Sequence, residues 1–197
     1  MRSSPRTTPT RVRLGGTAAV LAGLCYGAAG YLDRPGISGY TGALLSVLVV
    51  AVPALFLGGL LGLHSRLLLA ARTSLASGAG FVLGCFGAML GIVGALGLER
   101  TPPYSEITKW WWILLLAGLT LIGLAASSKG ELRLLGAVVS ISGVLGWVSV
   151  LADPAFSGAF VPIRSVHVVF AVAFCLSSVA WGTILMVPYS HIGVADS

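Results

Sequence analysis

Hydrophobic residues fill six long stretches of the chain, and polar residues fall almost entirely between them. Each stretch holds about 20 residues, enough for an α-helix to cross the roughly 30 Å hydrocarbon core of a bilayer. Because the stretches are apolar on every side, the alternating pattern of a membrane β-barrel does not fit. We therefore expect an all-α, polytopic membrane protein, a bundle of six transmembrane helices at about Leu14–Leu32, Tyr40–Leu63, Ser74–Leu98, Trp110–Ser127, Leu134–Ala152 and Val166–Val187.

Composition favours the same class, since 56% of the 197 residues are hydrophobic and only 9% are charged. A soluble domain of this size cannot bury that much apolar surface. No connector is long enough to fold by itself. The chain is thus expected to be one membrane domain over residues 14–188, with short tails at residues 1–13 and 189–197.

The charges indicate an orientation. Eight of the twelve basic residues flank one side of the predicted bundle: Arg2, Arg6, Arg11, Arg13, Arg66, Arg72, Lys129 and Arg133. The positive-inside rule then predicts that both termini are cytoplasmic. Two lysines beside many Arg, Ala, Gly, Leu and Val residues suggest a high-GC bacterium, so the membrane expected is a bacterial cytoplasmic membrane. The net charge of +6 is expected to attract anionic lipid headgroups, and no nucleic-acid partner is expected without a basic folded face.

The first stretch has a second interpretation, because a basic start and an apolar middle are also typical of a secretory signal. Its apolar run is longer than the usual 7–15 residues of a signal core. A retained first helix is the preferred prediction, and cleavage is the alternative.

A faint repeat relates two stretches of the sequence. Arg13–Asp33 and Arg133–Asp153 share Arg, Gly, Gly and Asp at the same spacing, and the first, third and fifth helices begin about 60 residues apart. Three helical hairpins in one orientation, produced by duplication, would explain the pattern. Chance similarity between glycine-rich spans would explain it too.

Three consecutive tryptophans, Trp110–Trp112, stand where the fourth stretch enters the predicted bilayer. Tryptophan favours that depth because its ring is apolar while its N–H reaches water or a headgroup. Successive helical residues point about 100° apart, so the three rings cannot converge on one ligand. We predict that they anchor the helix at the membrane interface, together with Tyr31 and Tyr40.

The third stretch carries the most specific pattern, a line of glycines at spacings of 4, 3, 4 and 3: Gly80, Gly84, Gly87, Gly91 and Gly94. This spacing places them on one face of a helix. Helices in lipid associate through close backbone contact, which small residues permit. Tight helix packing is the preferred interpretation, and a smooth surface for a sliding substrate or lipid is the alternative.

Residues for catalysis or coupled transport are hard to find. No Asp, Glu, Lys or Arg stands near the centre of a predicted span, although proton relays and ion coupling need such groups. His64 and His191 could hold a haem between the second and sixth helices, but interfacial hydrogen bonding is preferred. Cys25, Cys85 and Cys175 lack the spacing of a metal site. We expect no cofactor and no metal.

One enzymatic hypothesis rests on the sequence GISG, Gly36–Gly39. It resembles the Gly-x-Ser-Gly motif of rhomboid intramembrane proteases, which also have a six-helix core and a histidine in the last helix. The resemblance implies a Ser38–His167 pair. It covers four residues, and the serine precedes the second helix instead of the fourth.

These patterns predict a non-catalytic structural, assembly or lipid-facing accessory protein. The partners expected are membrane lipids and either another membrane protein or further copies of the chain. An uncoupled permease or channel for a small neutral or apolar solute is the main alternative, and an intramembrane serine hydrolase is a remote one.

Overall fold

The computed structural model describes residues 9–32, 41–70, 74–97, 104–128, 130–152 and 164–187. Within these ranges, six α-helices are long and apolar enough to cross a membrane. They are α1 (Thr10–Leu32), α2 (Thr41–Leu69), α3 (Leu75–Gly97), α4 (Tyr104–Ser127), α5 (Arg133–Ala152) and α7 (Arg164–Met186), with a one-turn 3-10 helix η1 (Gly130–Leu132) before α5. The predicted six-helix bundle is confirmed, and the chain is a multi-pass membrane protein.

Some helices are longer than the apolar runs that predict them. The helix α2 continues to Leu69, beyond the predicted end at Leu63. Leucines resume after the polar triplet His64–Arg66, so the helix still has apolar surface to bury. The helix α4 begins at Tyr104, before Trp110, with a polar first turn. Likewise α1 begins at Thr10.

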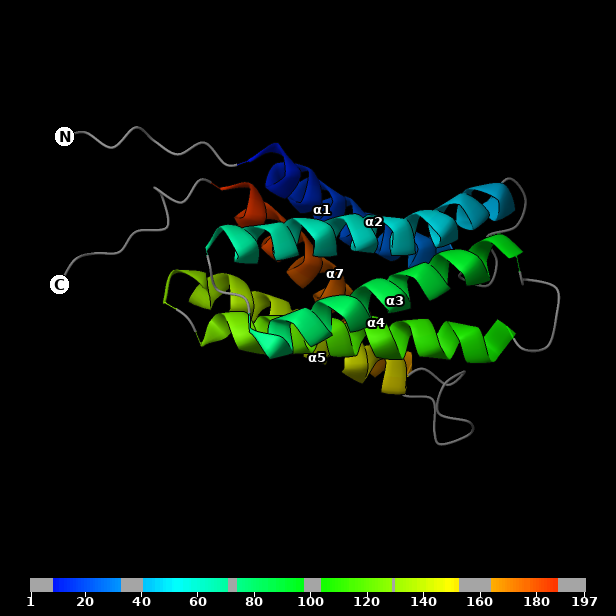
Figure 1. Ribbon diagram of the computed structural model, residues 1–197. Helices are drawn as coiled ribbons and strands as arrows, with labels where there is room; N and C mark the ends of the chain where they lie inside the picture. Colours follow the sequence, from blue (N-terminus) through cyan, green and yellow to red (C-terminus); the bar gives the residue numbers. More distant parts are fainter. Residues whose placement is uncertain are drawn as a thin grey trace, which may run out of the picture.

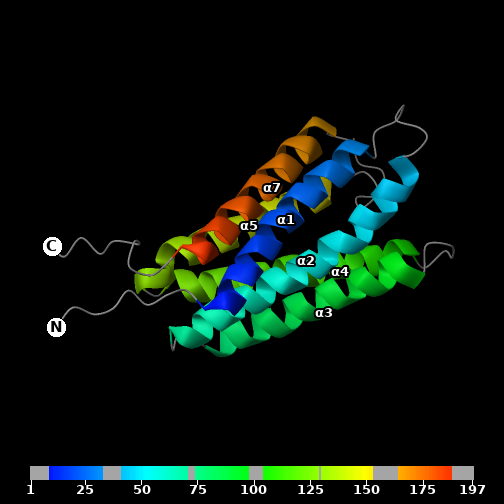
Figure 2. The same cartoon turned by 90° about the horizontal axis from the view of Figure 1, so that it is seen from above.

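The helices alternate in direction, so that α1 begins and α7 ends at one end of the bundle (Figure 1). We call this the near end and the opposite one the far end. The helix α1 packs between α2 and α7, and α4 packs between α3 and α5. The molecule thus has two layers of three helices, which meet where α2 contacts α3 and α5 contacts α7 (Figures 1 and 2).

The two layers have corresponding parts. The helices α1, α2 and α3 correspond to α4, α5 and α7, which come three helices later in the chain. Each pair of neighbouring helices then corresponds to another pair that is also in contact. Because consecutive helices alternate in direction, a shift of three helices inverts the layer. The proposed duplication of hairpins stays a prediction, and this regularity of three helices is distinct from it.

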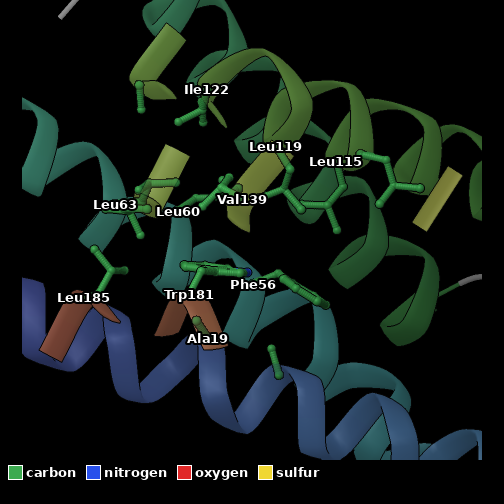
Figure 3. Packing of buried hydrophobic residues seen from close by; sticks show 14 of the residues in the cluster. Ala19, Phe56, Leu60, Leu63, Leu115, Leu119, Ile122, Val139, Trp181 and Leu185 are labelled. Atoms are coloured by element: carbon green, nitrogen blue, oxygen red, sulfur yellow. The ribbon is translucent and has the colours of Figure 1, made fainter. Parts of the chain in front are cut away.

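Large apolar side chains fill the space between the layers (Figure 3). Phe56 and Leu60 of α2 are fully buried, as are Leu119 of α4 and Trp181 of α7. They belong to one contiguous cluster to which all six long helices contribute buried or partly buried residues. Side chains exposed along the outer faces are also apolar, including Val82, Phe86 and Met89 of α3. This outer surface suits the hydrocarbon of a bilayer.

Candidate functional site

Aromatic rings from four helices meet inside the bundle. The centroid of Tyr26 lies 5.1 Å from Trp112 and 5.6 Å from Phe174, both edge-to-face. Phe174 also lies 5.7 Å from Phe56 and 6.0 Å from Trp112. Rings at these separations pack directly against one another. The cluster therefore joins α1, α2, α4 and α7 through ring contacts and is not an open aromatic cage.

The three consecutive tryptophans differ in exposure. Trp110 is 53% exposed, whereas Trp112 is 9% exposed and packs on Tyr26 inside the bundle. Trp111 is partly buried and lies beside Gly91. The Trp111 and Trp112 rings lie against each other, with centroids 4.0 Å apart, while the Trp110 ring is exposed, so the three rings do not enclose one ligand. Trp110 and Tyr31, which is 58% exposed, have the exposure that interface anchoring requires; Tyr40 lies outside the described residues.

The glycine line of α3 lies in helix contacts. A Cβ added at Gly80 would lie 2.9 Å from Gly118 O, and one added at Gly87 would lie 2.6 Å from Leu115 N, both in the backbone of α4. A Cβ at Gly84 would instead meet the end of the Leu60 side chain of α2, at 3.0 Å. Gly91 and Gly94 are also buried. The first four glycines thus face α4 and α2 and not the lipid.

Arg66, which the sequence places at a helix end, is a buried cation. It is 1% exposed, and its Nη1 donates hydrogen bonds to Leu185 O at 3.3 Å and Val187 O at 3.2 Å. The last carbonyls of a helix lack partners within the helix and carry partial negative charge. Arg66 therefore caps the end of α7 from α2. The leucines that follow it were the available signal that α2 continues past the charge.

The histidine and serine hypotheses fall partly outside the described residues. His64 stacks on Phe81 of α3, with centroids 4.0 Å apart, and its buried Nδ1 has no hydrogen-bond partner. His191 and Ser38 lie outside the described residues, as does the side chain of His167. The haem pair and the Ser38–His167 pair therefore stay hypotheses. Among the described residues, no three of His, Cys, Asp or Glu gather to hold a metal.

Two buried side chains of α7 carry polar atoms that have no hydrogen-bond partner. Trp181 is fully buried with its Nε1 unpartnered, and Ser178 is fully buried with its Oγ unpartnered. Ser178 lies at the contact with α1, where a Cβ added at Gly23 would be 3.1 Å from its Cβ. An unsatisfied buried polar group costs about 1–3 kcal/mol, so each requires an explanation.

Comparison with protein-family models, with curated proteins and with solved structures gives no match for this chain.

Proposed function

We propose that this chain acts as a non-catalytic structural, assembly or lipid-facing accessory protein of a bacterial cytoplasmic membrane. The observation that carries the proposal is the apolar filling between the two layers. Phe56, Leu60, Leu115, Leu119 and Trp181 are each 0% exposed and come from α2, α4 and α7. Side chains of this kind neither line an aqueous path nor transfer protons, which supports a non-catalytic role.

The buried charge supports the same proposal. Ionisable groups inside a membrane protein are costly and usually mark a transport or proton pathway. Arg66 has a structural use instead, because it donates to the terminal carbonyls of α7. It also lies in the last turn of α2, at the near end, and not at mid-membrane.

Copurification tests the proposal. The full-length chain would be cross-linked in native membranes, solubilised and isolated, and its companions identified by mass spectrometry. We expect a membrane protein or further copies of the chain in a fixed ratio. Recovery of the chain alone, without any such companion, would contradict an assembly role.

An uncoupled permease for a small neutral or apolar solute is the second candidate. What favours it is the contact between the layers, where side chains such as Leu60 and Phe174 can repack. Purified protein in liposomes would be tested for glycerol and urea flux by stopped-flow light scattering. The accessory role predicts the flux of protein-free liposomes, and a faster, protein-dependent flux would favour the permease.

The orientation is proposed from the basic residues, with both termini in the cytoplasm. Reporter fusions after the C-terminus and within the loop at residues 99–109 should report opposite compartments. A periplasmic signal from the C-terminal fusion would contradict this orientation.

A further inference from the structure

Backbone contacts hold each layer together. We call α1, α2 and α7 unit one and α3, α4 and α5 unit two. In unit one, a Cβ added at Gly62 would lie 2.5 Å from Gly15 Cα, and one added at Gly16 would lie 2.6 Å from Gly182 O. Since real Cβ atoms essentially never come within 3.0 Å of another atom, these helices touch through bare backbone.

Unit two is built in the same way. A Cβ added at Gly118 would lie 2.5 Å from Gly84 N of α3, and one added at Gly136 would lie 2.6 Å from the carbonyl carbon of Ala126. Thus α4 contacts both of its neighbours through backbone, as α1 does in unit one. Moving a helix within either unit would break contacts that no side-chain rotation can restore.

Contacts between the units are of another kind. A Cβ added at Gly84 would meet Leu60 Cδ1 of α2 at 3.0 Å, and one added at Gly146 would meet Phe174 Cδ2 of α7 at 3.2 Å. His64 meets Phe81 ring to ring. Rotamer changes can rearrange these three side-chain contacts. A Cβ added at Gly91 would lie 2.8 Å from Pro53 Cβ of α2, and that contact between the units cannot be relieved by a rotamer change. The two units are therefore the natural rigid bodies of the molecule, and motion is easiest between them.

The surface between the units, which we call the seam, contains two buried polar atoms that have no hydrogen-bond partner among the described residues, His64 Nδ1 and Trp181 Nε1. The Trp181 atom can only donate. Phe56, Leu60, Leu115 and Leu119 line the seam around Trp181 (Figure 3). The indole of Trp181 rests on unit one, with its Cη2 2.8 Å from the Cβ position of Gly59. Its nitrogen lies on the side toward Phe56 (Figure 3) and has no hydrogen-bond partner.

We propose that the units part along the seam and admit an apolar molecule carrying one hydrogen-bond-accepting oxygen, which the Trp181 N–H binds. The indole nitrogen is a donor only, so its partner must be an acceptor. The surrounding side chains are apolar, so the rest of the molecule must be apolar as well. The proposal goes beyond an accessory role and holds equally if the chain is a permease.

Nuclear magnetic resonance of the indole N–H groups tests the proposal. The full-length chain, labelled with ¹⁵N-indole tryptophan, would be placed in nanodiscs of ether-linked lipid, whose chains carry no carbonyl. The probes are 2-dodecanone, which has one acceptor oxygen, and dodecane, which has none. Trp181→Phe assigns the signal. If that variant does not fold, assignment by elimination uses Phe replacements of Trp110, Trp111, Trp112 and Trp147.

We expect the Trp181 proton signal to move downfield and to saturate with the ketone, while dodecane leaves it unchanged. Lipid-exposed Trp110 reports any non-specific effect of the probe. A downfield signal in ester-linked lipid without added probe would identify the lipid ester carbonyl as the acceptor, which also supports the proposal. No response to ketone or ester lipid, or equal responses to ketone and dodecane, would overturn it.

Discussion

Replacing Gly118 by alanine should push α4 away from α3. The new Cβ would lie 2.5 Å from Gly84 N and 2.6 Å from both Gly80 O and Gly84 Cα, all in the backbone of α3. Ordinary Cβ contacts are 3.4–4 Å long, so the helices must separate by about 1 Å. No side-chain rotation can relieve the overlap.

The size of the effect follows from two opposing terms. Overpacking costs about 1–3 kcal/mol, whereas alanine is favoured over glycine within a helix by up to about 1 kcal/mol. The net loss of stability should be about 1–2 kcal/mol. For a chain of this length, that loss lowers the melting temperature by about 2–8 °C.

Two matched controls come from α3. A Cβ at Gly78 would meet nothing within 4 Å, so Gly78→Ala should leave the melting temperature unchanged or raise it. Gly84→Ala should be nearly neutral, because its nearest obstacle is the flexible end of Leu60. All variants would be melted in dodecyl maltoside by scanning fluorimetry. Melting of Gly118→Ala with the parent, or of Gly84→Ala well below it, would contradict the backbone contact between α3 and α4.

Three further predictions concern single side chains. Arg66→Met should destabilise the protein by about 1–3 kcal/mol, because the terminal carbonyls of α7 lose a charged donor. Arg66→Lys should cost less stability than Arg66→Met. Equal melting temperatures of the parent and both variants would contradict the capping role of Arg66. Trp112→Leu should cost about 1–3 kcal/mol, since the ring is 9% exposed and packed on other aromatics. By contrast, Trp110→Leu should change stability by less than about 0.5 kcal/mol, and the reverse order of melting temperatures would refute this pair. Ser38→Ala should leave growth and membrane phenotypes intact, and labelling of Ser38 by a fluorophosphonate would count against it.

The six spans could be predicted because each apolar run matches the thickness of a bilayer. The glycine line of α3 was also visible, since its spacing follows the helical repeat. Which face of each helix contacts protein could not be found in the same way. Lipid and protein interior are both apolar, so the sequence gives Val82, which is 65% exposed, and Leu119, which is buried, the same character.

Trp112 and Arg66 show the same limit. Trp112 stands in a run of three tryptophans, and only the rotation of α4 about its axis separates it from Trp110. Arg66 looks like a boundary residue because its partners are backbone carbonyls of α7, more than 100 positions away in the chain. Every residue has a backbone carbonyl, so residue types do not indicate which carbonyls accept a hydrogen bond. The division into two units depends on which helices meet, and it has no local signal either.

The interior between the two units should be closed to water, and the reactivity of a cysteine placed there tests this most directly. Leu119 is fully buried between the units, whereas Ser128 is exposed at the near end. Leu119→Cys and Ser128→Cys would be made after Cys25, Cys85 and Cys175 are replaced by alanine, and treated in opened membranes with a charged thiosulfonate. We predict rapid labelling of the Ser128→Cys protein and none of the Leu119→Cys protein. Labelling of both at similar rates would contradict a closed apolar interior and would establish an aqueous path through the bundle.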